Sequence, residues 1–296
     1  MPPESPLAPA LSPIGYRGRL APSPTGFLHI GHARTFWTAC ERARANGGAM
    51  VLRIEDLDRS RCRPEFLAAI YEDLAWIGCT WQEGPNCGGP FAPYLQSLRQ
   101  DLYRGALSRL QESGHVYPCY CSRQDVLRAL GAPHEGDDEP LYPGTCRPDS
   151  DGPPRPMPAG RKPHWRFRVP DGRAITFVDA HLGSQAFIAG RDFGDFVVWR
   201  NDDVPSYQLA VAVDDAAMRI TEVVRGEDLL VSTARQLLLY EALGWAPPQF
   251  CHCLLVRDEA GVRLAKRHAS ANVRHLREQG RTPMQIRDGW VDSGNC

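Results

Sequence analysis

Residues 19–32 read Arg-Leu-Ala-Pro-Ser-Pro-Thr-Gly-Phe-Leu-His-Ile-Gly-His, and the rest of the chain is organised around this stretch. Its first three residues predict the end of a buried strand, the Pro and Gly residues that follow predict an irregular turn, and His29 to His32 predict the start of a helix. Apolar side chains spaced by three and four continue that helix, and Gly47-Gly48 ends it. The order strand, turn, helix is typical of an α/β domain.

The predicted helix start is suited to bind phosphate. Its free backbone N–H groups and the positive end of the helix dipole attract anions, and Gly31 allows a nucleotide to approach the backbone closely. His29 and His32 are three residues apart, so both lie on one face of the first turn. For an isolated His-x-Gly-His pattern, two polar residues at an exposed helix start are the alternative interpretation.

The whole string resembles a signature of the class I aminoacyl-tRNA synthetases, and Arg-x-Ala-Pro-Ser-Pro-Thr-Gly narrows the resemblance to their glutamyl and glutaminyl branch. The resemblance implies an enzyme that uses ATP, accompanied by magnesium, to form an aminoacyl-adenylate. His29, Gly31 and His32 are then expected to contact ATP, and both histidines are expected to be catalytic.

A second segment, Arg263-Leu-Ala-Lys-Arg267, resembles the other signature of the class, which is usually Lys-Leu-Ser-Lys-Arg in this branch. The resemblance implies that Lys266 and Arg267 bind ATP and that Lys266 is catalytic, because cations are needed where negative charge redistributes on the phosphates. An exposed basic loop is the alternative. Arg263 and Ala265 depart from the family pattern, which predicts either slower activation or an inactive paralogue.

The resemblance also implies a pocket for glutamate. Such a pocket needs a cation for the side-chain carboxylate, an anion for the ammonium group and a polar group that fixes orientation. The matching amino-acid-binding positions are Arg19, Ala21, Ser23, Glu55, Tyr207 and Arg225. Val211 stands where full-length glutamyl enzymes commonly have asparagine. Charges paired at strand ends are the alternative interpretation of Glu55 and Arg225.

Three cysteines are candidates for a metal site. Cys119, Cys121 and Cys146 offer soft thiolates, which suit zinc, and a structural zinc needs a fourth ligand. From the residues alone, a chance grouping in a chain with ten cysteines is equally plausible. The resemblance implies a zinc module with the ligands Cys119, Cys121, Tyr142 and Cys146; His115 and His134 are alternatives to Tyr142.

Composition limits the class of protein. The chain has 296 residues and a net charge of −1, so an RNA-binding surface must be a local patch. The Pro-rich N-terminus lacks the features of a signal peptide, and no apolar run approaches the roughly 18 residues of a membrane helix. We therefore expect a cytoplasmic protein with no membrane partner, whose cysteines are free thiols or metal ligands. We also expect it to be a monomer.

Periodicity predicts the order of the elements. The expected fold is α/β, with the doubly wound parallel sheet (Rossmann type) of a class I synthetase catalytic domain, an inserted zinc-binding module and a short C-terminal extension. The expected strands are 49–55, 165–169, 175–178 and 196–199, with further strand packing at Cys251-His-Cys253 and a hairpin of 254–256 and 262–265. The expected helices begin at Pro64 and at Ser232, and a third spans 94–111 with Leu95, Leu98, Leu102, Ala106 and Leu110 inward.

Five segments follow from these patterns. We expect a disordered segment at 1–14, the two halves of the catalytic domain at 15–113 and 191–250, the inserted module at 114–190, and a C-terminal segment at 251–296 that carries the lysine loop and no anticodon-binding domain.

In its shortness and in the string Tyr-Gln-Leu-Ala-Val at 207–211, the chain resembles a branch of the family that activates glutamate with ATP and transfers it to queuosine in the anticodon of tRNA(Asp). That resemblance implies queuosine-bearing tRNA(Asp), glutamate and ATP as partners. A minimal glutamyl-tRNA synthetase that charges a tRNA 3′ end is one alternative. A non-catalytic RNA-binding paralogue is another.

Overall fold

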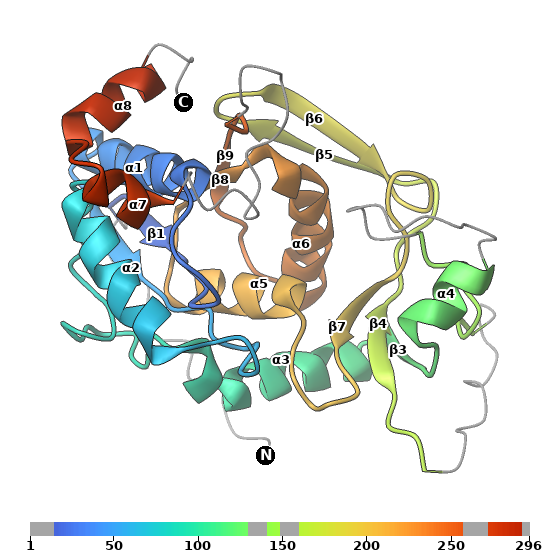
Figure 1. Ribbon diagram of the computed structural model, residues 1–296. Helices are drawn as coiled ribbons and strands as arrows, with labels where there is room; N and C mark the ends of the chain where they lie inside the picture. Colours follow the sequence, from blue (N-terminus) through green and yellow to red (C-terminus); the bar gives the residue numbers. More distant parts are fainter. Residues whose placement is uncertain (1–14, 130–140, 149–159, 257–271, 292–296) are drawn as a thin grey trace.

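The computed structural model describes residues 15–129, 141–148, 160–256 and 272–291 (Figure 1). Two parallel strands, β1 (Arg17–Leu20) and β2 (Ala49–Leu52), are joined by helix α1 (Ile30–Ala45). A second parallel pair, β8 (Glu222–Gly226) and β9 (Gln249–Cys253), is joined by α6 (Leu230–Leu243). The backbone N–H of Thr221 donates to the Arg17 carbonyl at 2.9 Å, so β8 lies beside β1. The predicted α/β class is confirmed.

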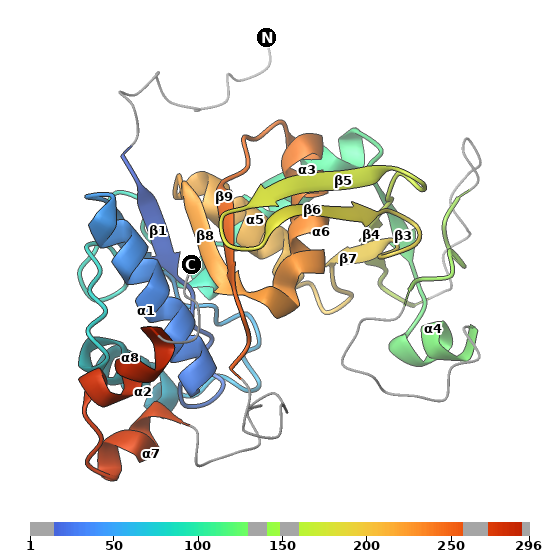
Figure 2. The same ribbon diagram turned by 90° about the horizontal axis from the view of Figure 1, so that it is seen from above.

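Helices cover both faces of these parallel strands, as Figure 2 shows. Helix α1 packs against β1 and β8 on one face, while α5 (Tyr207–Ala217) and α6 lie on the other. Helices α2 (Pro64–Trp76), α7 (Val273–Glu278) and α8 (Pro283–Val291) gather beside α1. Short 3₁₀ helices at Gln96–Leu98 and Glu227–Leu229 precede α3 (Gln100–Glu112) and α6.

Two further groups of strands extend the fold. β5 (Ala174–Asp179) pairs with β6 (Gly183–Ile188) in antiparallel fashion and with β9 in parallel, giving the order β6-β5-β9-β8. β3 (Val116–Cys119), β4 (His164–Phe167) and β7 (Phe196–Trp199) form an antiparallel sheet, and α4 (Arg123–Ala129) follows β3. Each of these two sheets contains strands from before and after residue 190, where the sequence analysis placed the end of the inserted module. The segment boundaries given there remain predictions.

Some local expectations are wrong, and for the segment before α3 the cause is a contact with a residue far away in the sequence. The strand expected to reach Glu55 ends at Leu52, and the helix expected from Tyr94 begins only at Gln100. Leu98 and Leu102, expected inward, are 64% and 47% exposed.

Polar side chains occupy the inward positions instead. Gln96 donates to Asp214 Oδ2 at 2.8 Å and Arg99 donates to its Oδ1 at 2.7 Å. Because a buried carboxylate needs such donors, they fix the rotation of this segment.

The C-terminal part also differs from expectation. Residues 254–256 are not a strand, residues 262–265 lie outside the described part of the chain, and α7 and α8 were not predicted. Within the described ranges, no helix combines the length and the apolar character needed to cross a bilayer.

Candidate active site

The start of α1 carries the residues expected at the nucleotide. His29 is the N-cap, and its Nδ1 accepts a hydrogen bond from the Gly31 N–H at 3.2 Å. His32 is exposed one turn away. The backbone of Asn272 bridges to His29, and the Val273 N–H donates to the Leu28 carbonyl at 2.8 Å, so the segment leading into α7 lies against this helix start.

Packing among the described residues does not require a glycine at Gly31. Of these residues, a Cβ built there would meet only the His29 ring, at 3.6 Å, which is an ordinary contact. The space that a side chain would fill is therefore left at the positive end of the helix, where an anion is stabilised. Lys266 and Arg267, the other expected ATP ligands, lie outside the described residues.

The irregular turn after β1 connects two strand ends. The Glu55 N–H donates to the Pro22 carbonyl at 3.0 Å and the Arg63 N–H donates to the Pro24 carbonyl at 3.1 Å. Ala21 is half-buried and Ser23 is exposed on this turn. The hydrogen bonds hold the chain after β1 beside the chain after β2, at the carboxyl ends where ligands of α/β sheets bind.

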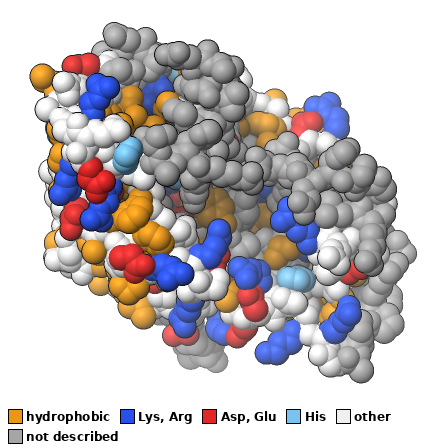
Figure 3. Space-filling model, viewed as in Figure 1, with side chains coloured by type: hydrophobic (Ala, Val, Ile, Leu, Met, Phe, Trp, Pro, Cys, Tyr) orange, Lys and Arg blue, Asp and Glu red, His pale blue; other side chains and the backbone are white. Residues whose placement is uncertain are grey.

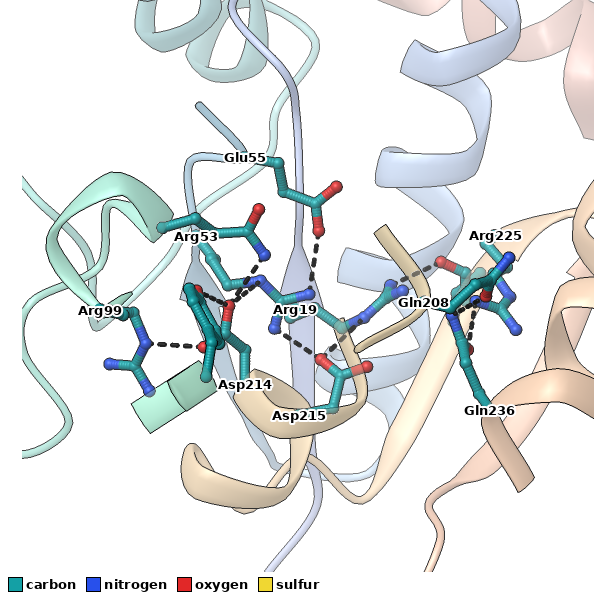
Figure 4. A network of polar contacts seen from close by, with 12 residues as sticks. Arg19, Arg53, Glu55, Arg99, Gln208, Asp214, Asp215, Arg225 and Gln236 are labelled. Carbon is teal, nitrogen blue, oxygen red and sulfur yellow. Dashed lines mark hydrogen bonds and ion pairs between the residues drawn. The ribbon is translucent and has the colours of Figure 1, made fainter. Parts of the chain in front are cut away.

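Buried carboxylates surround Arg53 below this turn (Figure 4). Its guanidinium donates to Asp215 Oδ1 at 2.6 Å and to Glu55 Oε1 at 3.1 Å, and its Nε lies 3.7 Å from Asp214 Oδ2. Burial raises the pKa of Glu55, while Arg53 and Arg19 act to lower it. Arg53 is thus well compensated within the protein, and together these contacts orient Glu55.

Arg19 lies on the neighbouring strand and shares Asp215. Its Nη1 donates to the Val224 carbonyl at 2.9 Å, and its Nε lies 3.6 Å from Asp215 Oδ1. That Nε is buried and makes no hydrogen bond to any residue in the described ranges. Arg19 therefore retains hydrogen-bonding capacity in a desolvated place.

Arg225, on β8, is buried among neutral acceptors. Its Nε donates to His252 Nε2 at 3.2 Å, its Nη1 to Gln236 Oε1 at 2.9 Å and its Nη2 to Thr233 Oγ1 at 2.7 Å. No carboxylate of the described residues lies within salt-bridge distance of it, and burial lowers the pKa of its guanidinium. A buried guanidinium in such surroundings is suited to receive the carboxylate of a ligand.

Helix α5 supplies the remaining expected residues. Tyr207 is its first residue and is 38% exposed, and Ser206 caps the helix by accepting from the Leu209 N–H at 3.4 Å. Val211 is buried one turn later and offers no polar group. Gln208 accepts from Gln236 at 3.1 Å, which ties α5 to the partners of Arg225.

These positions form one polar region made from β1, β2, β8 and α5. Arg19, Glu55 and Arg225 belong to the network of polar contacts drawn in Figure 4. Tyr207 is the first residue of α5. Two buried cations and one carboxylate match the two carboxylates and the ammonium group of an acidic amino acid. Asp179, Gln208, Asp214, Asp215, Thr233, Gln236 and His252 belong to the same polar surroundings and were not singled out for this site from the sequence.

The expected metal ligands come together in a separate cluster. The Sγ atoms of Cys119, Cys121 and Cys146 all lie within 4.8 Å of one another. The Tyr142 hydroxyl lies 3.3 Å from Cys119 Sγ and 3.7 Å from Cys121 Sγ. Tetrahedral zinc with Zn–S bonds of about 2.3 Å separates its sulfur ligands by about 3.8 Å, and the Cys121 and Cys146 Sγ atoms are 3.6 Å apart. One metal ion is small enough to contact all of these atoms.

A nearby cation also contacts this cluster. Arg166 Nε donates to Cys119 Sγ at 3.2 Å, and its guanidinium lies 3.9 Å from the centre of the Tyr142 ring. Burial raises the pKa of the Cys121 thiol to about 12, so a bound cation is needed to hold that ligand as a thiolate. A cavity of about 450 Å³ next to Tyr142 is lined by residues of this module and of the β5–β6 region, away from Arg19 and Arg225.

The face shown in Figure 3 carries basic side chains interspersed with acidic ones. Among the described residues on that face they do not merge into one continuous basic surface. This distribution agrees with the near-neutral charge of −1 for the whole sequence.

The chain matches a family and several curated proteins. Residues 16–294 match the model for the catalytic domain of class I tRNA synthetases (E and Q). A glutamyl-Q tRNA(Asp) synthetase of Symbiobacterium thermophilum is 50% identical over 91% of this chain and 83% of its own length. One of Nitratidesulfovibrio vulgaris is 49% identical over 89% of this chain and 82% of its own length.

A solved structure gives the same result. A glutamate tRNA ligase from Elizabethkingia meningosepticum, crystallised in complex with its amino acid, has a TM-score of 0.74 and 34% identity. The match covers 86% of this chain but 52% of that protein, so the chain spans about half the length of this solved relative. The predicted class I synthetase catalytic fold is confirmed, and the chain belongs to the class I tRNA synthetases (E and Q), a family of ligases.

Proposed function

We propose that the protein activates glutamate with ATP and transfers it to queuosine in the anticodon of tRNA(Asp). The observation that carries the glutamate part is Arg225, a buried guanidinium whose hydrogen-bond partners in the described part of the chain are neutral. The names of two relatives, each about half identical over most of this chain, support the queuosine-bearing acceptor. The protein is proposed to act in the cytoplasm as a monomer.

In the first step the α-carboxylate of glutamate attacks the α-phosphorus of ATP, which forms glutamyl-adenylate and releases pyrophosphate. The helix start at His29, Gly31 and His32 stabilises negative charge on the phosphates. Lys266 and Arg267 bind the departing pyrophosphate, and magnesium accompanies ATP. In the second step a hydroxyl group of the acceptor attacks the activated carbonyl and AMP leaves.

The amino-acid pocket orients glutamate for the first step. Arg225 and Arg19 are the cations for its carboxylates, Glu55 is the anion for its ammonium group, and Tyr207 provides a hydroxyl at the edge. Ala21 and Ser23 border the pocket on the turn. A glutamine side chain would place a neutral amide against a buried cation, so the pocket favours the acid over the amide.

We also propose that Cys119, Cys121, Tyr142 and Cys146 hold one structural zinc ion. A closed set of four protein ligands leaves no open position for catalysis, so the metal would stabilise the fold of its module.

A second candidate activity is charging of a tRNA 3′ end. The 34% identity to a glutamate tRNA ligase favours it, because that protein carries the same catalytic fold. The two activities share adenylate formation and differ in the acceptor.

The decisive experiment is glutamate-dependent exchange of labelled pyrophosphate into ATP, measured first without RNA. We expect exchange with glutamate and little with glutamine or aspartate, followed by transfer to queuosine-bearing tRNA(Asp) whose 3′ end has been oxidised with periodate. Exchange that appears only when tRNA is added, with a product lost after periodate treatment, would favour 3′ charging. No exchange under either condition would point to a non-catalytic paralogue.

A further inference from the structure

Three adjacent strands place one polar residue each in a row. Asp179 ends β5, His252 lies in β9, and Arg225 lies opposite His252 in the register of β8. His252 is completely buried, and its ring lies between the other two side chains. The row therefore leads from a carboxylate, through an imidazole, to the guanidinium proposed to bind glutamate.

Asp179 is held as a carboxylate. Its Oδ1 accepts from the backbone N–H groups of His252, His181 and Leu182 at 3.1, 3.0 and 2.9 Å. Its Oδ2 lies 2.6 Å from His252 Nδ1. Burial acts to raise the pKa of Asp179, but these hydrogen bonds outweigh it and the pKa is lowered.

The carboxylate fixes the tautomer of His252. Because Oδ2 can only accept, Nδ1 must carry the proton, and Nε2 is left as an acceptor. Arg225 Nε donates to that Nε2 at 3.2 Å, and the Thr233 hydroxyl lies 3.0 Å from it. Asp179 thus determines that Nε2 of a neutral imidazole accepts the hydrogen bond from Arg225.

We propose that Asp179 and His252 are positioning residues, which orient the Arg225 guanidinium without giving it a competing carboxylate. This inference rests on the proposed function, in which Arg225 binds a carboxylate of glutamate. Arg53 shows the contrast, since it contacts carboxylates directly and its charge is compensated inside the protein. A protein carboxylate in direct contact with Arg225 would compete with the carboxylate of the substrate. The neutral imidazole of His252 accepts from the Arg225 Nε–H without neutralising the guanidinium, so it does not compete.

His252 stays neutral over the working range of pH. Burial and Arg225 lower its pKa to about 4, against the raising effect of Asp179. The groups around the ring are Asp179 of β5, Arg225 of β8, Thr233 of α6, Cys253 of its own strand, and the rings of Phe177 and Phe250. We therefore expect no inflection from His252 in the pH profile of the KM for glutamate between pH 6 and pH 9.

The test compares His252→Leu, which removes the acceptor, with His252→Gln, whose amide oxygen can replace Nε2. We expect the KM for glutamate in pyrophosphate exchange to rise about tenfold or more in His252→Leu, with a smaller effect on kcat. His252→Gln should stay within about threefold of wild type by the same scale. His181→Gln, on the turn that caps Asp179, is the matched control and should leave both constants unchanged.

Nitrogen-15 NMR gives a readout that does not need activity. His252 should show the neutral tautomer with its proton on Nδ1, and the Arg225 Nε–H signal should be slow to exchange in wild type and His252→Gln but lost in His252→Leu. Asp179→Asn should weaken the tautomer preference. An enzyme that exchanges pyrophosphate with an unchanged KM in His252→Leu overturns the positioning role. NMR results as expected in a protein without glutamate-dependent exchange would instead overturn the proposed function and leave the positioning role supported.

Discussion

Two buried arginines should respond in opposite ways to the same substitution. Arg53 contacts Asp215 at 2.6 Å and Glu55 at 3.1 Å, whereas the hydrogen-bond partners of Arg225 among the described residues are neutral. If Arg225 serves a ligand and Arg53 serves the fold, Arg225→Gln should damage activity and Arg53→Gln should damage stability.

The magnitudes follow from these contacts. Arg225→Gln loses three hydrogen bonds from a charged donor, worth about 1.5–3 kcal/mol each, and it also removes a guanidinium whose desolvation costs several kcal/mol. These effects oppose each other, so the free energy of unfolding without glutamate should stay within about 2 kcal/mol of wild type. Arg53→Gln removes the 3.1 Å contact of Glu55 and, among the described residues, leaves Asp215 with only the longer, 3.6 Å contact of Arg19, and breaking such a buried pair costs about 3–5 kcal/mol.

Arg225→Gln should instead impair the use of glutamate. Removing one partner of a buried, hydrogen-bonded charge pair in a binding site costs about 2–5 kcal/mol, so kcat/KM for glutamate should fall by about 30-fold to several thousand-fold in Arg225→Gln. Pyrophosphate exchange measures this loss, and urea unfolding without glutamate measures stability. If Arg225→Gln is as destabilised as Arg53→Gln, or keeps kcat/KM within about threefold of wild type, the assignment of Arg225 is refuted.

Four further outcomes are expected. Cys146→Ala should lose bound zinc and unfold at lower temperature, whereas Cys87→Ala, an exposed cysteine outside the cluster, should keep its zinc by atomic absorption; retention of zinc in both would contradict the ligand set. Burial raises the pKa of Asp73 to about 6, so its charged form destabilises the folded state above that pH and the penalty is absent below about pH 4. Asp73→Asn should therefore stabilise the protein at pH 7.5 by up to about 3 kcal/mol in urea unfolding and have little effect at pH 4; an equal effect at both would speak against the buried carboxyl. Gly31→Ala should unfold like wild type, because the added methyl has room, yet raise the KM for ATP in the exchange assay, and an unchanged KM would remove Gly31 from the nucleotide site. Lys266→Ala should lower the rate of exchange by about 10² to 10³ while leaving the fold intact by circular dichroism, and unchanged turnover would exclude its role.

Local signals determined those parts of the fold that were predictable. The turn between β1 and α1 contains prolines and a glycine that permit no regular element, α2 starts at Pro64, and α6 ends at Gly244 in the left-handed conformation. Each of these signals lies within a few residues of the boundary that it specifies. These boundaries could be predicted from the sequence because no contact with a distant residue shifts them.

The start of α3 was not predictable in the same way. Leucines at three- and four-residue spacing indicated a helix from Tyr94, but Gln96 and Arg99 turn inward to reach Asp214, which is more than a hundred residues away. A buried carboxylate without donors costs more than the exposure of two leucines. Periodicity counts apolar positions and carries no information about such a partner.

The same limit applies to the site. The resemblance indicated Arg19, Glu55 and Arg225, but it did not indicate which of their neighbours are charged. The sequence pattern indicated only strand packing for Cys251-His-Cys253, although a histidine between two cysteines in a buried strand is a polar residue that must find partners. That requirement was the available signal, and only the pairing of β5, β9 and β8 identifies the partners as Asp179 and Arg225.

The distribution of buried carboxylates separates Arg53 and Arg99 from Arg225, which is proposed to bind a ligand. Asp214 serves Arg99 and Asp215 serves Arg53, both through short contacts within the fold. Arg225 is held on its edges by an imidazole, an amide and a hydroxyl, none of which neutralises it. Burying a cation in this way is unfavourable until an anion arrives, so the cost of folding around Arg225 is recovered only when a carboxylate binds, and binding of glutamate should stabilise the protein in proportion to its affinity.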